Sequence, residues 1–340
     1  MTSADERLMA RALRSAEAGA EWCVAAPRTA VLVVRDGEVR FEIVGRAGPE
    51  GAWEQALRNA GAGDTLVSPL PPPASQFDQV RAVGPGALVL GSAMPGGLEE
   101  LEGVEVRVGI LEASCAELNP VVLCGRPWVR LKLAMSLDGR TALSNGASQW
   151  ITGSDARADV QRLRARSGAL VTGVGTVLAD DPRLNVRTGD AGIDTVRRWR
   201  VVLDSAFRTP ASAVLLQEPS LACGPVEIWG TAEAPAQRGE CLEVPADPEG
   251  RVAIEHVVRE LGRRGVQEIL FECGAALAGT LLESGLLDEL VVYIAPKFLG
   301  HRGRGLVELP EYTAVDQAPG MRLVQSRQIG EDVRLILRNV

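Results

Sequence analysis

Apolar and polar residues in the first third of the chain follow helical and extended periods in turn. Ser3 and Glu6 form a capping-box pattern, and apolar residues at helical spacing up to Gly19 predict a first helix. Alternating apolar positions at residues 29–34 and 38–44 flank an Asp-Gly pair, which favours a β-hairpin. The further elements expected here are a helix at residues 52–60 and a buried strand at 87–90. This alternation predicts an α/β domain.

The pattern breaks at residues 119–127, where a proline, a glycine and a second proline interrupt it. The strands expected beyond the break are residues 128–135, 169–172, 200–204, 268–272 and 289–294, and the helices are residues 155–166, 254–264 and 275–284. Ser154 is the expected N-cap of the first of these helices, and runs at 321–325 and 332–337 predict a closing hairpin. We therefore expect two domains, 1–124 and 125–340. The second is expected to hold an open, largely parallel sheet that binds ligands beyond the carboxyl ends of its strands.

Composition agrees with a two-domain soluble protein rather than a membrane or nucleic-acid-binding protein. The 340 residues exceed the roughly 150 of one typical domain, and 46% are hydrophobic and 24% charged, as in soluble globular proteins. No apolar run reaches the roughly 18–20 residues that cross a bilayer, and the N-terminus lacks signal-peptide features. We therefore expect a cytoplasmic protein without a membrane partner. The net charge of −8 disfavours nucleic acid as a partner.

The cysteines and histidines give little support to metal or hydrolytic chemistry. Six cysteines occur without a Cys-x-x-Cys pair, which argues against a disulfide framework or zinc ribbon. They are Cys23, Cys115, Cys124, Cys223, Cys241 and Cys273. The only histidines, His256 and His301, have no triad or metal-ligand pattern nearby. Redox chemistry with a diffusible cofactor needs no such residues, because the cofactor carries the hydride.

Two glycine-rich segments each follow a predicted strand and precede a predicted helix. The first covers residues 173–187 and begins with Gly173 and Gly175, and the second covers residues 272–280. Such turns let the backbone approach a phosphate and offer it free N–H groups. The first matches neither the three-glycine dinucleotide fingerprint nor a Walker A loop, so a plain strand-to-helix turn is its simpler interpretation. Two such turns in one sheet still suggest a divided ligand, such as a dinucleotide.

Charged residues gather in the same region of an otherwise acidic chain. The arginines are Arg157, Arg162, Arg164, Arg166, Arg183 and Arg187. Such a cluster is commonly a solvated helix face, whereas one or two arginines in a cleft would hold a phosphate. Lys132, within an apolar strand, needs a carboxylate, a ligand or access to solvent. Glu272 is either a substrate partner or a capping or surface carboxylate, and Trp150 is either a core residue or a cofactor contact.

Several motifs occur in a fixed order through the second domain. They are residues 132–142, 148–152, 173–187, 201–205, 272–274 and 293–300. In order and spacing they resemble the reductase domain of the bifunctional riboflavin biosynthesis deaminase/reductase family, over nearly all of residues 126–340. The resemblance implies a dihydrofolate-reductase-like fold, NADPH as hydride donor and a small phosphorylated pyrimidine substrate. That substrate is 5-amino-6-(5-phosphoribosylamino)uracil, whose ribosyl group is reduced to ribityl, and the family suggests a homodimer formed through the reductase domains.

The resemblance also assigns roles to individual residues. The implied cofactor contacts are Ala134, Trp150, Thr176, Asp180, Ser205, Gly274, Ala275, Ala276, Leu277, Ala278, Gly279 and Thr280. The implied substrate contacts are Ser148, Arg164, Leu184, Arg187 and Glu272, with the arginines holding the phosphate. Lys132 and Asp180 are the candidates for polarising or protonating the opened sugar imine, and Glu272 is a further proton-donor candidate. Ser205 and Arg208 are the candidates for selecting NADPH over NADH, and no metal is expected.

The first domain resembles the family's cytidine-deaminase-like domain but departs from it where zinc would bind. The matching segments are residues 9–13, 33–37 and 109–112. That domain needs a His-Ala-Glu motif and two cysteines, so that zinc activates water while the glutamate moves protons. In this chain Gly51 stands at the His position and Trp53 at the Glu position. Shifting the alignment by one residue places Glu54 at the Glu position but still supplies no His. Pro72 and Pro73 stand where the family has Pro-Cys. We expect a degenerate domain without zinc or deamination, retained for packing, oligomerisation or regulation.

Two alternatives stay open at this point. The first keeps the fold and NADPH but reduces another phosphoribosylated amine, against which the motif matches at Ser148, Arg164, Arg187 and Glu272 argue. The second is a non-catalytic homologue that binds only nucleotides or partners, and the intact glycine segments argue against it.

Overall fold

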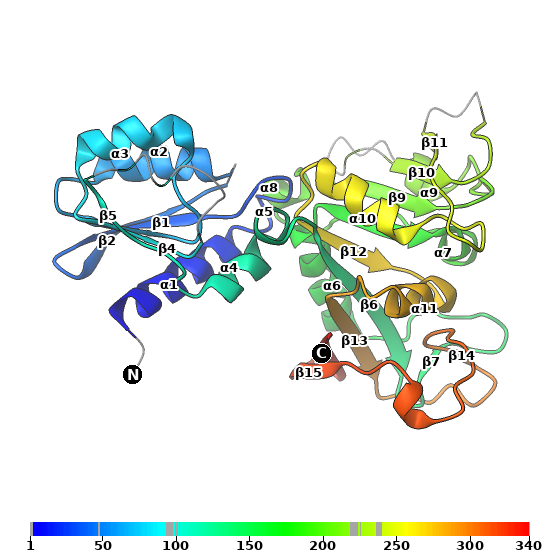
Figure 1. Cartoon of the computed structure of the whole chain (residues 1–340). Helices are drawn as coiled ribbons and strands as arrows, with labels where there is room; N and C mark the ends of the chain where they lie inside the picture. Colours follow the sequence, from blue (N-terminus) through cyan, green and yellow to red (C-terminus); the bar gives the residue numbers. More distant parts are fainter. Residues whose placement is uncertain are drawn as a thin grey trace. The chain divides into compact units, whose positions relative to one another are not determined.

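The computed structural model describes residues 3–46, 48–92, 98, 101, 103–217, 224, 226–235 and 240–339, so Cys223 lies outside the described residues. The chain divides into two compact units, Met1–Arg126 (unit 1) and Pro127–Val340 (unit 2). Each unit combines a β-sheet with helices on its faces, which confirms the expected α/β class (Figure 1). Within the described part, no helix has both the length and the apolar character needed to span a membrane.

Unit 1 contains one five-stranded sheet. Its strands are β1 (Ala30–Arg35), β2 (Glu38–Val44), β3 (Thr65–Ser68), β4 (Ala87–Leu90) and β5 (Glu105–Arg107), in the order β2-β1-β3-β4-β5. β1 runs antiparallel to β2 and β3, and the other neighbours are parallel. The helices α1 (Ala4–Ala18) and α4 (Glu112–Leu118) pack on one face, and α2 (Pro49–Asn59) and α3 (Phe77–Val83) pack on the other.

Two local predictions for unit 1 are confirmed in atomic detail. The capping box of α1 is complete: Ser3 Oγ accepts from the Glu6 amide at 3.1 Å, and the Glu6 carboxylate accepts from the Ser3 amide at 2.8 Å. The β1–β2 hairpin turns at Asp36 and Gly37, whose φ angles of 54° and 78° suit a tight two-residue turn. Local side-chain chemistry therefore fixes both features.

Unit 2 is built on a nine-stranded sheet. Its strands are β6 (Trp128–Ser136), β8 (Ala169–Gly173), β9 (Trp199–Leu203), β10 (Val226–Gly230), β11 (Cys241–Glu243), β12 (Glu268–Glu272), β13 (Glu289–Ala295), β15 (Arg322–Ile329) and β16 (Asp332–Arg338). They follow the order β11-β10-β9-β8-β12-β6-β13-β16-β15. All neighbours from β11 to β13 are parallel, and the predicted C-terminal hairpin adds the antiparallel β16 and β15. β7 (Arg140–Ala142) and β14 (Arg304–Gly305) form a separate antiparallel pair.

Helices cover both faces of the unit 2 sheet. On one face lie α10 (Ile254–Arg263) and α11 (Ala275–Glu283), and on the other lie α6 (Ser154–Arg166), α7 (Val174–Asp180) and α9 (Val214–Gln217). Successive residues of β9 serve the two cores, because Val201 packs with the α10 and α11 side and Val202 with the α7 side. The remaining short elements are η1 (Ala74–Gln76), α5 (Pro120–Cys124), α8 (Ala191–Asp194) and η3 (Val315–Gln317).

Two local features differ from the sequence-based expectation. The N-cap of α6 is Gly153, whose amide donates to Asp332 Oδ2 at 2.8 Å, and Ser154 is the first helical residue. The predicted break at residues 119–127 contains the short helix α5, which starts at Pro120, where the missing N–H of proline does no harm. The first glycine segment, by contrast, leads from β8 directly into α7, as the expected strand-to-helix turn does.

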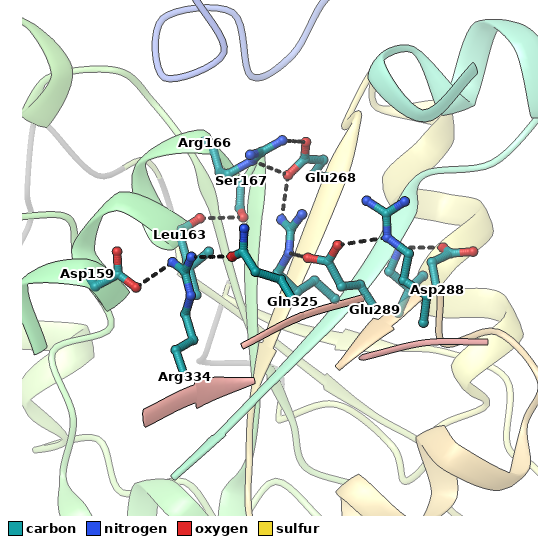
Figure 2. A network of polar contacts seen from close by, with 12 residues as sticks. Asp159, Leu163, Arg166, Ser167, Glu268, Asp288, Glu289, Gln325 and Arg334 are labelled. Atoms are coloured by element: carbon teal, nitrogen blue, oxygen red, sulfur yellow. Dashed lines mark hydrogen bonds and ion pairs between the residues drawn. The ribbon is translucent and has the colours of Figure 1, made fainter. Parts of the chain in front are cut away.

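A buried ion network joins neighbouring strands of unit 2 where β12 and β13 begin (Figure 2). Arg130 of β6 donates to Glu268 of β12 and to Glu289 of β13, each at 2.6 Å. The same two carboxylates bind Arg166 of α6 at 2.7 Å and Arg338 of β16 at 3.3 Å. Burial alone would raise the pKa of Glu289, but Arg130 and then Arg338 hold it below its usual value. The network therefore stays ionised at neutral pH.

Candidate active site

The central strands of unit 2 create a topological switch point. After β6 the chain moves outward through β8, β9, β10 and β11, and it then returns as β12 between β8 and β6. Open α/β sheets bind ligands at the strand ends beside such a point. A cavity of about 1380 Å³ lies here, lined from the ends of β8 and β12, from β6 and from α6. Pockets for a single small ligand usually have volumes of about 300–1,000 Å³, so this cavity is larger than one such ligand needs.

Most residues expected in the site line this cavity. They are Lys132, Ala134, Ser148, Trp150, Arg164, Thr176, Asp180, Leu184, Arg187, Ser205, Glu272, Gly274, Ala275, Ala276, Leu277 and Thr280. Ala278 and Gly279, also expected to contact the cofactor, lie elsewhere on α11. Ala278 is fully buried in the core, and Gly279 packs so closely on the backbone of Glu308 that no side chain would fit. The helical turn directs these two residues away from the cavity, and they fix α11 against its neighbours.

The N-terminus of α11 opens into the cavity. Gly274 is its N-cap, and no side chain of the described residues caps the first turn. Its free N–H groups can bind an anion. A Cβ built on Gly274, or on Gly175 of the other glycine segment, would meet no atom within 4 Å. In both segments the backbone is therefore open to the approach of phosphate oxygens. This arrangement fits the pyrophosphate of a dinucleotide.

A lysine and an arginine flank a carboxylate at the end of β12. Lys132 and Glu272 are register partners on β6 and β12, so their side chains share one face of the sheet. Arg164 of α6 donates to both Glu272 oxygens, at 2.6 and 2.8 Å, and its Nη1 donates to the Asn185 carbonyl at 3.0 Å. The Arg164 and Glu272 side chains are only 13% and 14% exposed. The fork-shaped pair therefore fixes the carboxylate beside the lysine.

The protonation states of this group follow from burial and charge. Burial alone would raise the pKa of Glu272, but Arg164 and then Lys132 bring it below its usual value. The expectation that Glu272 donates a proton is not supported, because an ionised carboxylate has none to give. Burial lowers the pKa of Lys132, Glu272 opposes this, and Arg164 adds to the lowering. Lys132 therefore releases a proton more readily than an ordinary lysine, which suits a general acid.

Several other predicted residues lie toward the solvent-facing side of the cavity. Ser148 Oγ donates to Asp180 Oδ1 at 3.0 Å; Ser148 is partly buried and Asp180 is exposed. Trp150 is 64% exposed, so it is not a core residue, and the Arg157 guanidinium lies 4.7 Å from the centre of its ring. Arg187 is also exposed and lines the cavity from the loop after α7.

Comparison with known proteins decides the family. The sequence model of the RibD C-terminal domain matches residues 127–335. The chain belongs to the RibD family. The riboflavin biosynthesis protein RibD of Escherichia coli is 36% identical, with 98% of this chain and 99% of that protein aligned. The solved structure of Acinetobacter baumannii RibD is 31% identical and covers 99% of each chain with a TM-score of 0.85.

A second solved structure carries a more explicit name. It is a Thermotoga maritima diaminohydroxyphosphoribosylaminopyrimidine deaminase/5-amino-6-(5-phosphoribosylamino)uracil reductase, 25% identical, with a TM-score of 0.82 over 99% of each chain. Membership in the RibD family makes this chain a riboflavin biosynthesis reductase, an oxidoreductase that uses a nicotinamide cofactor and a small phosphorylated pyrimidine. The family and enzyme class expected from the sequence are confirmed.

Lys297 contacts one wall of the cavity, and it was not among the residues expected from the sequence. Its Nζ donates to the backbone carbonyl of Trp150 at 2.9 Å and so ties the loop after β13 to a wall of the cavity. A signal was present in the composition: of 36 lysines and arginines, only Lys132 and Lys297 are lysines. Arginine is the residue at every other Lys/Arg position, so these two lysines stand out in the sequence.

In unit 1, the positions aligned with the deaminase motif of the RibD family have other contacts. Trp53 is fully buried, and its indole N–H donates to the carbonyl of Leu70, in the loop after β3, at 3.3 Å. Gln76 Nε2 donates to the carbonyl of Glu50 at 2.8 Å. Among the described residues, no group of three or more His, Cys, Asp and Glu side chains is arranged to hold a metal ion.

Proposed function

We propose that this chain reduces the ribosyl group of 5-amino-6-(5-phosphoribosylamino)uracil to ribityl with NADPH, and that it does not deaminate. The observation that carries the proposal is one cavity shared by two glycine segments and the largely buried Lys132. Burying a lysine is unfavourable unless its charge or proton is used.

The residues present fit NADPH, which supplies a hydride when it is bound. The free N–H groups at the start of α11 and the open backbone at Gly175 would hold its pyrophosphate. Ser205 and Arg208 follow β9 on the cavity wall, and the Arg208 side chain is 62% exposed. A cation at this place would favour the extra phosphate that distinguishes NADPH from NADH.

The chain supplies the proton and the alignment of the substrate. Reduction of the open-chain sugar imine adds a hydride at C1′ and a proton at the nitrogen. We assign that proton to Lys132 Nζ, while Glu272, fixed by Arg164, stabilises the ammonium before transfer. Asp180 is the second candidate for polarising the substrate, from the exposed rim where it accepts from Ser148.

Arg187→Ala is expected to raise the KM for the phosphorylated substrate by about 10- to 100-fold with little change in kcat. The reason is that a charge-assisted hydrogen bond contributes roughly 1.5–3 kcal/mol. Steady-state kinetics at saturating NADPH measures this. The dephosphorylated substrate is the control, because its KM is expected to be the same in both proteins. An unchanged KM for the phosphorylated substrate contradicts the role of Arg187.

The purified chain is expected to contain far less than one zinc ion per molecule and to release no ammonia from the undeaminated precursor. The fully buried Trp53 at the aligned glutamate position supports this, since an indole can neither bind zinc nor move a proton. Elemental analysis and an ammonia assay measure the two quantities. Stoichiometric zinc together with deaminase turnover would overturn the proposed loss.

A turnover assay separates the proposal from its alternatives. The absorbance of NADPH is followed with the deaminated ribosylaminouracil phosphate, with its undeaminated precursor and with other phosphoribosylated amines. The proposal predicts turnover with the first compound and much lower kcat/KM with the rest. Preference for another phosphoribosylated amine supports a reductase of that amine. Binding of NADPH without any turnover supports a non-catalytic protein.

A homodimer formed through unit 2 is part of the proposal, because the resemblance to the family implies it. The edge strand β15 supports this, since Leu323 and Val324 are 54% and 43% exposed on it. Long exposed edge strands are usually covered by a partner or protected by charge.

A further inference from the structure

Lys132 lies between two different neighbours on the sheet. On β12 its register partner is Glu272, and on β13 the ring of Tyr293 lies diagonally beside it, with Lys132 Nζ 5.9 Å from the ring centre. Within the described residues, no hydrogen bond is made by Nζ. Both oxygens of Glu272 already accept from Arg164. The aromatic face is therefore the second group that stabilises the ammonium.

The Tyr293 ring is held rigidly in this position. The residue is fully buried, and its hydroxyl donates to Asp159 Oδ2 of α6 at 2.8 Å. The same oxygen accepts from Arg334 Nη1 of β16 at 2.7 Å, and Figure 2 shows Arg334 pointing at Asp159. Ala134 and Val160 pack around the ring. A helix and two strands thus fix the plane of the ring.

We propose that Tyr293 is a positioning residue whose ring holds the Lys132 ammonium at the cavity, opposite Glu272. Tyr293 does not line the cavity itself, so it acts through the lysine. The charged groups that face Lys132 are Glu272 of β12 and Arg164 of α6, with Asp159 behind the ring. The inference rests on the proposed role of Lys132 in proton transfer.

The ring and the hydroxyl of Tyr293 can be separated by substitution. Tyr293→Phe keeps the ring but leaves Asp159 with only its arginine partners, Arg334 at 2.7 Å and Arg162 at 3.8 Å. It is therefore expected to lower thermal stability while the Lys132 pKa changes by a few tenths at most. Tyr293→Leu keeps an apolar side chain without an aromatic face. It is expected to lower the Lys132 pKa by about one unit, since a desolvated cation–π contact contributes up to about 2 kcal/mol. A purely structural role predicts no difference between the two variants in that pKa.

The two-lysine composition allows a direct measurement. Protein labelled with ¹³C at lysine Cε has two signals, which Lys297→Arg assigns, and each is titrated by NMR in the absence of substrate. The expected result is a Lys132 pKa lowered in Tyr293→Leu and retained in Tyr293→Phe. Tyr293→Met repeats the ring deletion where the leucine variant does not fold. A wild-type pKa in a folded ring-deleted variant, or an equal drop in Tyr293→Phe, overturns the proposal.

Kinetics provides a second readout and separates this inference from the proposed function. Loss of the ring makes the ammonium lose its proton at lower pH, so the alkaline limb of the kcat profile moves to lower pH in Tyr293→Leu. Tyr293→Phe is expected to keep the wild-type limb. If the wild-type chain shows no turnover but NMR still finds a lowered Lys132 pKa in Tyr293→Leu, the positioning role is supported and only the reductase proposal is contradicted.

Discussion

Lys132→Met is expected to lower kcat by about 10²- to 10⁴-fold, the usual contribution of a positioned general acid. Methionine has similar length and tolerates burial, so the change removes the proton and the charge but little volume. Binding of NADPH is expected to stay within a few-fold, because the glycine segments that would hold it are unchanged. Stopped-flow kinetics of NADPH oxidation and fluorescence titration of NADPH measure the two quantities.

Lys132→Arg is the matched comparison for this substitution. It keeps the positive charge, but a guanidinium does not release its proton at neutral pH. We expect a loss close to that of Lys132→Met. A kcat within three-fold of the parent in the methionine variant would remove Lys132 from the proposed proton transfer, whereas activity retained only in the arginine variant would assign it a purely electrostatic role.

Arg130→Met is expected to destabilise unit 2 by about 3–5 kcal/mol, the usual effect of removing one partner from a buried ion pair. Glu268 and Glu289 are 2% and 6% exposed and would face each other without the cation between them (Figure 2). Hydrogen exchange of the β6, β12 and β13 amides reports on unit 2 alone. These amides are expected to exchange about 10²- to 10⁴-fold faster in the variant. Arg263→Met is the control, since its pair with Glu260 is largely exposed and contributes at most about 1 kcal/mol.

The pH dependence of this effect has a definite sign. The folded-state pKa of Glu289 lies below its unfolded value of about 4.3. Its stabilising contribution is therefore complete above that unfolded value and is lost as the pH falls through the lower folded value. The difference in stability between the parent and Arg130→Met is expected to shrink below about pH 4. Equal stability of the two proteins at pH 7 would contradict the account of the network.

Features set by neighbouring residues were predictable from the sequence. The capping box at Ser3 and Glu6 needs only contacts within one turn, and the Asp36–Gly37 turn needs only its own backbone preference. The strands at residues 87–90 and 268–272 were also predicted with their observed bounds, because short apolar runs were bounded by glycine or charge. The cap of α6 was misplaced because the Gly153 amide binds Asp332, a contact across 179 residues.

The sequence predicted which residues form the site better than it predicted their chemical roles. Sequence motifs identified Lys132, Arg164 and Glu272 but not the ion pair between the last two, which joins residues 108 positions apart. That pair decides which group keeps its proton, so the role of Glu272 depended on tertiary structure. Ala278 and Gly279 were included because the motif is contiguous, whereas a helix presents only part of a contiguous run to any one cavity. The contact of Tyr293 with Lys132 likewise required the register of β6 and β13.

The most direct test of the central claim is the transfer of deuterium from NADPH to the sugar. NADPH carrying two deuterium atoms at C4 of the nicotinamide is incubated with the deaminated ribosylaminouracil phosphate, and the product is analysed by mass spectrometry. The account predicts a ribityl product with one deuterium at C1′, formed by the parent protein and nearly absent with Lys132→Met. A ribityl product without deuterium, or no ribityl product from the active-site-intact chain, would contradict it.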